Sequence, residues 1–252
     1  MGKHAKYRSL VGAFALLLAV WPTVGQALCR QALALGHDVS GSVDAQEYDL
    51  QMNGLARALL SDEVSGAFLA IPDVPVRLMV YEWSGTGVQT TIVPWTDIRS
   101  KADLADVVEI LTKPERRPRI ASTAVGDAIL YGALALADQT ECWRRTLDIS
   151  ADGKSNVGPH PSALRLVPML QGITINALIV ASKARNRPPE WSDSEPALRQ
   201  YFTQNVVRGA DAFVQSAYGY ADYARAIKLK LLKELETRAI GHMSPKPDKA
   251  RG

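Results

Sequence analysis

The sequence predicts an α/β protein with a doubly wound, mostly parallel sheet, one antiparallel edge strand and helices on both faces. Two observations support this fold class. Apolar strand-like runs alternate with amphipathic helical stretches along the 252-residue chain, which is the pattern of βαβ units. One run, residues 173–180 (ITINALIV), is apolar almost without a break, as expected when helices cover both faces of a strand.

The composition favours one globular domain over other protein classes. Hydrophobic residues make up 47% of the chain and charged residues 22%, which is ordinary for a folded protein. A single long apolar run excludes a polytopic membrane protein, and two cysteines are too few to replace a packed core. The sequence contains no internal repeat and no interdomain linker, so we expect one domain over residues 28–240.

The first 27 residues are typical of a secretory signal peptide. Three basic residues precede an uncharged apolar run over residues 10–20, and the segment ends in Gly25-Gln26-Ala27. An uncleaved anchor is the alternative, but the run is shorter than the ~20 residues that a spanning helix needs. Cys29 would also suit a lipoprotein, except that Leu28 stands where lipoprotein peptidases require a small residue. We expect a secreted or periplasmic protein with no membrane span after cleavage.

Cleavage of this segment changes the net charge. The whole chain has a formal net charge of +3. Lys3, Lys6 and Arg8 supply three positive charges, and the first 27 residues contain no Asp or Glu. The remaining chain is therefore close to neutral, and its charge gives no indication of nucleic-acid binding.

The expected elements follow in order from hydrophobic periodicity. Strands are expected at residues 32–38, 76–83, 88–93, 145–150, 173–180 and 212–216. Helices are expected at residues 45–60, 100–111, 123–138, 162–171, 196–206 and 220–238. Loops are expected at residues 61–75, 113–119 and 185–194, and a disordered tail at residues 241–252.

Cap and turn residues set several of these boundaries. Asp44 followed by Glu47 has the pattern of a capping box, and Ser100 is a typical N-cap for the next helix. Residues 84–87 (SGTG) form a turn between two strands, so this pair is predicted to be antiparallel at a sheet edge. Two prolines in residues 113–119 (KPERRPR) favour a loop there.

The strongest local signal is the run Asp38-Val39-Ser40-Gly41-Ser42, where an apolar strand ends and a helix begins. Ligands bind at the carboxyl ends of the strands in open α/β sheets. Carboxylate and hydroxyl oxygens suit Mg²⁺ or a similar hard cation and do not suit zinc. Thr123 before a helix and Asp152 after another strand supply further oxygens at the same end of the sheet.

This ordered set resembles the von Willebrand factor A fold with its metal-ion-dependent adhesion site. That site uses an Asp-x-Ser-x-Ser motif, a distant Thr and a distant Asp, in this order. The chain is most similar to a bacterial family of secreted von Willebrand A-like proteins of uncharacterised function, from about Leu33 to Leu235. The resemblance is carried by residues 38–44, 82–85, 93–96, 148–153 and 230–234.

The resemblance implies adhesion rather than catalysis. Ser40, Ser42 and Thr123 would bind the cation, and Asp38 and Asp152 would do so partly through water. A further coordination position would accept a carboxylate from a partner protein, because an ion with few direct carboxylate ligands stays electrophilic. We expect Mg²⁺, with Mn²⁺ or Ca²⁺ as alternatives, and a protein partner that presents an acidic residue. The oligomeric state stays open.

Other interpretations of these residues also stay open. Asp and Ser after a strand are ordinary turn and cap residues, so a structural module with a vestigial metal site is one alternative. A Mg²⁺-dependent phosphohydrolase with Asp38 as nucleophile is another, but that chemistry usually uses a carboxylate two residues on, where this chain has Ser40. His37 departs from the family's apolar strand and would weaken the metal site if it were protonated.

The two cysteines predict one disulfide in an exported protein. Cys29 lies nine residues before Asp38, and Cys142 lies ten residues before Asp152. If the two Asp residues end neighbouring parallel strands, both cysteines lie together at the opposite end of the sheet. Two buried free thiols are the alternative.

Basic loops are expected beside the metal site, where they would steer an acidic partner toward the cation. Solvated loop charges with no such role are the alternative. The residues concerned are Lys113, Arg116, Arg117 and Arg119 before Thr123, Lys154 after Asp152, and Lys183, Arg185 and Arg187.

Overall fold

The computed structural model describes residues 29–113, 119–181 and 194–236. The expected signal peptide and the expected tail lie outside these ranges, and both stay predictions. Among the described helices, none is both long and apolar enough to cross a membrane.

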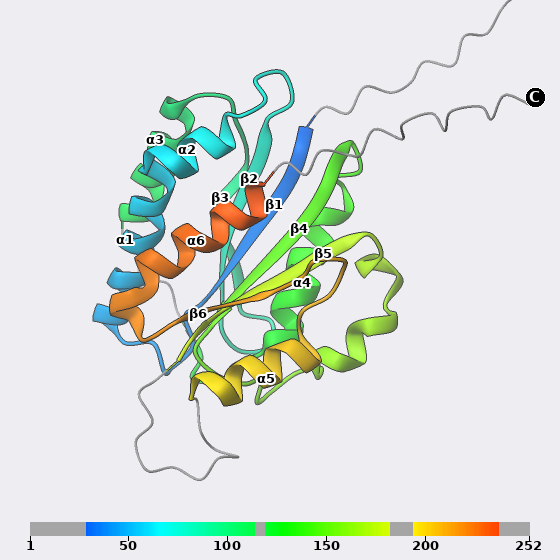
Figure 1. The fold of residues 1–252 in the computed structure, drawn as a ribbon. Helices are drawn as coiled ribbons and strands as arrows, with labels where there is room; N and C mark the ends of the chain where they lie inside the picture. Colours follow the sequence, from blue (N-terminus) through cyan, green and yellow to red (C-terminus); the bar gives the residue numbers. More distant parts are fainter. Residues whose placement is uncertain (1–28, 114–118, 182–193, 237–252) are drawn as a thin grey trace, which may run out of the picture.

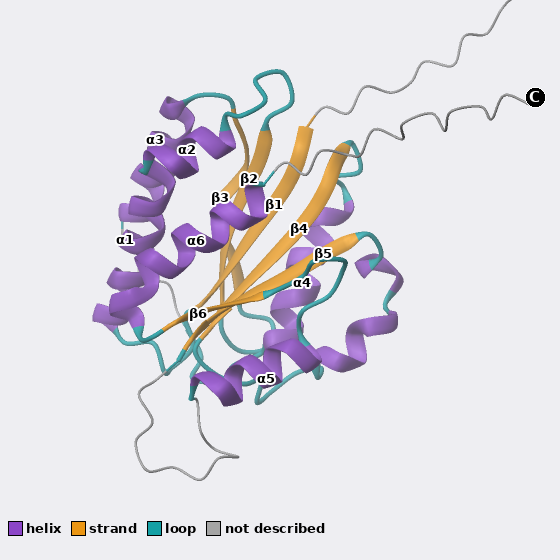
Figure 2. Ribbon diagram, viewed as in Figure 1, coloured by secondary structure: helices purple, strands orange, loops and turns teal. Residues whose placement is uncertain are grey.

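A six-stranded sheet forms the centre of the molecule (Figures 1 and 2). The strand order is β3-β2-β1-β4-β5-β6, and every neighbouring pair is parallel except β2 with β3. The expected fold class, including its antiparallel edge strand, is confirmed. The strands are β1 (Cys29–Asp38), β2 (Val76–Trp83), β3 (Gln89–Ile98), β4 (Cys142–Ala151), β5 (Ile173–Val180) and β6 (Val214–Ala217).

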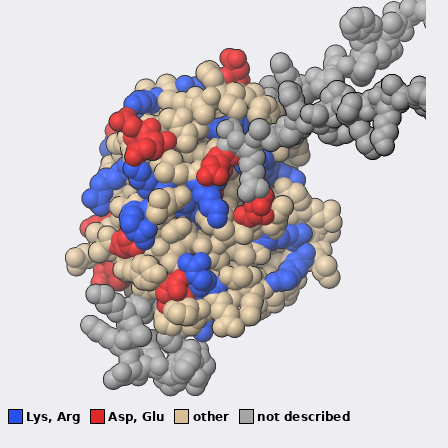
Figure 3. Space-filling model, in the orientation of Figure 1, with Lys and Arg blue, Asp and Glu red and all other residues tan. Residues whose placement is uncertain are grey.

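Helices cover both faces of the sheet (Figure 1). They are α1 (Ala45–Leu60), α2 (Asp62–Phe68), α3 (Lys101–Thr112), α4 (Val125–Ala137), α5 (Glu195–Asn205) and α6 (Tyr223–Leu235). One apolar core joins the sheet to α1, α2, α3 and α6, and the other joins it to α4 and α5. Leu33 and Leu35 of β1 belong to the first core and Ala32 and Ala34 to the second, as the alternation of a strand requires. Figure 3 shows one side of the molecule, on which positive and negative side chains lie interspersed.

The two predicted helix caps are confirmed. The Asp44 carboxylate accepts a hydrogen bond from the Glu47 N–H, and the Glu47 carboxylate accepts one from the Asp44 N–H. Ser100 caps α3 in the same reciprocal way with Asp103. Each cap satisfies N–H groups that have no partner inside the helix.

Two expected elements are wrong. Residues 61–75, expected to be a loop, contain α2, because Val64 and Phe68 lie one helical turn apart and both pack in the core. Residues 162–171, expected to be one helix, form two short 3₁₀ helices, Pro161–Leu166 and Pro168–Leu170. Pro168 has no N–H to donate, so an α-helix cannot continue through it.

Other boundaries differ by a few residues. The segment expected as a helix from residue 220 begins with a 3₁₀ turn, Tyr220–Asp222, before α6 starts. Strand β3 continues to Ile98 instead of ending at residue 93, and its pairing with β2 is irregular around Pro94. An edge strand tolerates proline because one side of it makes no ladder hydrogen bonds.

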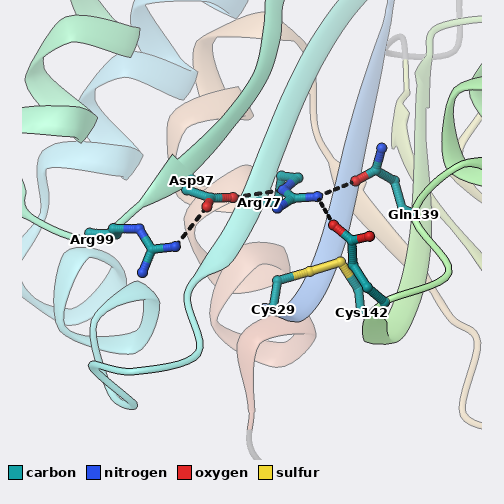
Figure 4. The surroundings of a disulfide bond; sticks show 7 residues. Cys29, Arg77, Asp97, Arg99, Gln139 and Cys142 are labelled. Atoms are coloured by element: carbon teal, nitrogen blue, oxygen red, sulfur yellow. Dashed lines mark hydrogen bonds and ion pairs between the residues drawn. A yellow bond between two sulfur atoms is a disulfide. The ribbon is translucent and has the colours of Figure 1, made fainter. Parts of the chain in front are cut away.

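The predicted disulfide is confirmed. Cys29 and Cys142 are register partners at the start of β1 and β4, and their Cα atoms lie 4.6 Å apart. Figure 4 shows Arg77 of β2 beside this bond, where its guanidinium pairs with Asp97 (2.6 Å) and Glu141 (2.8 Å). The bridge and this ion-pair group therefore join β1, β2, β3 and β4 at the end of the sheet opposite Asp38.

Candidate metal centre

Asp38 and Asp152 lie at the same edge of the sheet because β1 and β4 are parallel neighbours. The register runs from Cys29 with Cys142 to His37 with Ser150. Asp38 is the last residue of β1, and Asp152 follows the end of β4. These carboxyl ends lie at the lower left of Figure 1.

Hydrogen bonds bring the five predicted site residues into one group, which we call the edge cluster. The Asp38 Oδ1 atom accepts a hydrogen bond from the Ser40 N–H (2.8 Å). The hydroxyl oxygens of Ser40 and Ser42 lie 3.2 Å apart, and the Ser42 hydroxyl donates to Asp152 Oδ1 (2.8 Å). The Thr123 hydroxyl lies 3.3 Å from the Ser40 hydroxyl oxygen. The structure thus places two carboxylates and three hydroxyls together.

The loops that carry these residues are packed closely against one another. A Cβ atom on Gly41 would lie 2.7 Å from the Cα of Ala121, so a side chain there would displace the loop before Thr123. Asn156 holds Thr123 from the other side: its side-chain oxygen accepts from the Thr123 N–H, and its own N–H donates to the Thr123 carbonyl, both at 2.9 Å. Asn156 was not among the predicted site residues, because only its place in the polar loop after Asp152 marks it.

Asp38 is a buried acid in an unfavourable position for negative charge. The residue is 1% exposed, and its Oδ2 atom has no hydrogen-bond donor among the described residues. Burial, and then the nearby Asp152 carboxylate, raise the pKa of Asp38 to about 8, although hydrogen bonds from Ser40 and from the Asp152 backbone oppose this rise. A cation at this position would offset both unfavourable effects.

His37 does not carry the positive charge that the sequence analysis considered. It is fully buried, and its Nδ1 lies 3.0 Å from the Tyr223 hydroxyl on α6. Burial, and then the charge of Lys230, lower the pKa of His37 to about 3. The imidazole is therefore neutral at pH 7, so it does not repel a metal ion as a protonated His37 would.

The side chains of the edge cluster fit a hard divalent cation. All their polar atoms are oxygens, which Mg²⁺, Mn²⁺ and Ca²⁺ prefer. Within the described ranges, no group of three or more His, Cys, Asp and Glu residues could hold a metal, and a site of two carboxylates with hydroxyls is of a different type. The most direct indication of a cation position is that the Asp38 Oδ2 atom is buried without a hydrogen-bond partner among the described residues.

The expected basic rim is described only in part. The Arg119 guanidinium contacts the carbonyl oxygen of Val43, directly after the Asp-x-Ser-x-Ser motif. Lys154 lies in the loop after Asp152. Its role in steering a partner stays a prediction, as does that of Arg119. The remaining rim residues that fall outside the described ranges are Arg116, Arg117, Lys183, Arg185 and Arg187.

The chain matches a protein-family model over most of its length. The family described as "Protein of unknown function (DUF1194)" matches residues 28–239. The chain belongs to this family. The matched segment includes every residue of the DUF1194 chain that the structure describes. No curated protein matches the sequence.

Solved structures show that this DUF1194 protein has the von Willebrand A fold, as its sequence resemblance implied. Proximal thread matrix protein 1 from the mussel byssus has a TM-score of 0.57 and 18% identity, over 84% of this chain and 47% of that one. The pilus adhesin SpaC from Lactobacillus rhamnosus GG gives 0.56 and 15%, over 83% and 30%. A von Willebrand factor type A protein from Catenulispora acidiphila gives 0.54 and 15%, over 82% and 43%.

These neighbours are longer than the matched region. The DUF1194 chain spans about half the length of the mussel protein. Another structure of that mussel protein has a zinc-occupied MIDAS motif. At these identities the likeness establishes the fold, and the function of this chain has to be argued from its own residues.

Proposed function

We propose that this protein is an exported, divalent-metal-dependent protein-binding module. Asp38, Ser40, Ser42, Thr123 and Asp152 would hold the cation. A bound Mg²⁺, Mn²⁺ or Ca²⁺ supplies an electrophilic centre for a carboxylate oxygen of a partner protein. The observation that carries the proposal is the meeting of these five side chains, from three distant segments, in one hydrogen-bonded cluster.

The edge cluster is buried on one side and open to solvent on the other. Asp38, Ser40 and Thr123 are buried, whereas Ser42 is exposed and Asp152 is half-buried. A partner would therefore approach from the side of Ser42 and Asp152. Three of the five ligands are neutral hydroxyls, and the two carboxylates would act partly through water. The ion would therefore keep its attraction for a further anion.

Two further observations support the proposal. The first 27 residues have the pattern of a signal peptide, which agrees with a role outside the cytoplasm. A neighbour in fold, the mussel byssus protein, is described with zinc in its MIDAS motif. By contrast, the phosphohydrolase alternative needs an acid/base group two residues after Asp38, and the Ser40 hydroxyl at that position does not titrate at neutral pH.

Calorimetric titration of Mg²⁺ and of Mn²⁺ into the purified protein tests this function. We expect saturable binding of one ion per chain to the wild type and none to Asp38→Ala. Asp49→Ala is the matched control, because Asp49 is an exposed acid on α1 outside the edge cluster. Circular dichroism of each variant shows whether the fold is retained.

The outcomes separate the proposal from the structural alternative. Binding that both variants retain would place the ion elsewhere and contradict the proposed ligands. Failure of the folded wild type to bind either ion would contradict the metal-dependent function and support a structural module whose Asp and Ser residues only shape turns.

A further inference from the structure

Three apolar side chains stand exposed around the edge cluster. Ile120 is 48% exposed, Val157 38% and Tyr218 64%. Ile120 lies three residues before Thr123, and Val157 directly follows Asn156, which holds Thr123. Tyr218 directly follows β6, whose parallel pairing with β5 brings its carboxyl end to the same edge of the sheet.

The position of Tyr220, two residues after Tyr218, shows that the loop after β6 lies near the edge cluster. Tyr220 is buried, and its ring stacks on that of Tyr223 with the ring centroids 6.4 Å apart. The Tyr223 hydroxyl lies 3.0 Å from Nδ1 of His37, the residue directly before Asp38. The loop after β6 therefore borders the metal centre.

The backbone at each of the three apolar positions is fixed by a hydrogen bond. The Ile120 N–H donates to the Ser84 hydroxyl (3.2 Å). The Val157 carbonyl accepts from the Ser155 hydroxyl (3.3 Å), and the Tyr218 N–H donates to the Asp222 carboxylate (3.0 Å). A backbone that is already held reduces the conformational freedom lost on binding, and this favours these positions for a binding surface.

Apolar side chains around a charged contact also serve a physical purpose. They exclude water from the central contact, and the most important residues of protein interfaces are commonly surrounded in this way. When the partner residues beside the carboxylate are apolar, no unpaired polar side chain of the partner faces Ile120, Val157 and Tyr218 in the complex. A carboxylate within a run of other charges would leave those charges facing apolar groups, at a cost in desolvation.

We infer that the partner presents its acidic residue within an apolar stretch, whose neighbouring side chains pack on Ile120, Val157 and Tyr218. This inference rests on the proposed function, since the acidic residue is held by the metal centre. It adds the chemical class of the partner segment: one Asp or Glu flanked by aliphatic or aromatic residues.

A peptide library tests this inference. Displayed peptides have a fixed central Asp or Glu and three randomised positions on each side, and they are selected on the wild-type protein with Mn²⁺ and eluted with EDTA. We expect the selected peptides to carry aliphatic or aromatic residues beside the fixed acid. Their affinity should fall about tenfold for the double variant Ile120→Ser with Val157→Ser, while calorimetry shows unchanged Mn²⁺ binding.

Matched controls use exposed apolar residues elsewhere. Leu134→Ser and Leu166→Ser change side chains that are 63% and 92% exposed and lie on α4 and on the first 3₁₀ helix. Both variants should bind the selected peptides as the wild type does. Equal losses in the control and rim variants, no loss in the rim variant, or metal-dependent peptides with polar or acidic neighbours would each overturn the inference.

The same selection separates this inference from the function on which it rests. A library that yields no Mn²⁺-dependent peptide, or peptides that bind Asp38→Ala as well as the wild type, would contradict the proposed metal-dependent function. Metal-dependent peptides that Asp38→Ala does not bind would support that function, and the residues beside their acid then decide the further inference alone.

Discussion

Two groups of carboxylates in this molecule differ in how their negative charge is balanced. At the edge cluster, Asp38 and Asp152 lie among the hydroxyls of Ser40, Ser42 and Thr123. Beneath α6, by contrast, the Nζ atom of Lys230 lies 2.7 Å from Asp148 Oδ2 and 2.6 Å from Glu234 Oε1. We call this second group the α6 cluster.

The α6 cluster is built as a structural element. Asn176 of β5 donates to Glu234 (2.7 Å) and accepts from the Phe213 N–H (3.1 Å). Lys230 and Glu234 are fully buried side chains of α6, and Asp148 belongs to β4. The chain supplies its own cation here, whereas the edge cluster offers oxygen ligands alone. The comparison indicates that the α6 cluster holds α6 in place and that the edge cluster is suited to a cation from solution.

Removal of the internal cation should have the largest effect on stability. Lys230→Met leaves two buried carboxylates without their partner, so we expect a loss of about 3–5 kcal/mol in the free energy of unfolding. Urea unfolding measures it. Lys228→Met is the control on the same helix, because Lys228 is 33% exposed in its ion pair with Glu63, and a surface pair contributes at most about 1 kcal/mol. Equal losses in the two variants would contradict the structural role of the α6 cluster.

Addition of an external cation should stabilise the edge cluster by a smaller amount. At a free Mn²⁺ concentration 100 times its Kd, we expect the wild type to gain about 2.7 kcal/mol of unfolding free energy. Urea unfolding with Mn²⁺ and with EDTA gives this gain. Asp38→Ala should lose it and Asp49→Ala should keep it. A gain that persists in Asp38→Ala would show that the stabilising ion binds elsewhere.

The α6 cluster should make stability depend on pH even without metal. Burial, opposed by Lys230 and reinforced by Glu234, raises the pKa of Asp148 to about 7. The folded protein therefore holds a proton that the unfolded chain releases near pH 4, so this contribution is present at pH 4 and is lost as the pH rises toward 7.

Asp148→Asn should remove this pH dependence. Between pH 4 and 7 in EDTA, the unfolding free energy of the wild type should fall relative to Asp148→Asn by about 1 kcal/mol per pH unit. Asp73→Asn, a change of an exposed acid, should leave the slope of the wild type unchanged. A wild-type slope that Asp148→Asn does not alter would show that this carboxyl group does not hold the proton.

The smallest expected effect sharpens the role of one hydroxyl. Thr123→Ser keeps the oxygen of the edge cluster, so Mn²⁺ affinity should stay within about threefold of the wild type, while Thr123→Val should lose about tenfold, or 1.4 kcal/mol. Calorimetry compares the two variants. Equal affinities for Ser and Val at this position would show that the Thr123 hydroxyl is not a ligand.

The sequence was sufficient for those features that depend on where strands end. Asp38, Asp152 and the two cysteines could be placed because parallel neighbours bring equal positions along their strands together. Thr123 could be placed because it precedes a helix that starts at the same edge. Each of these inferences uses local patterns and one rule of sheet topology.

The missed features depend on packing between distant residues. Asp148, Asn176, Lys230 and Glu234 come from three elements, and nothing local in the sequence pairs a lysine on α6 with a carboxylate on β4. Helix α2 was missed because seven residues are too few for a clear 3.6-residue period.

Anomalous diffraction from crystals that contain Mn²⁺ tests the central claim most directly. We predict a manganese peak among the oxygens of Ser40, Ser42 and Thr123, beside Asp38 and Asp152. We predict none in the α6 cluster, where Lys230 already supplies the positive charge. A saturated crystal with no peak at the edge cluster, or with its peak beside Asp148, would contradict the assignment of the two clusters.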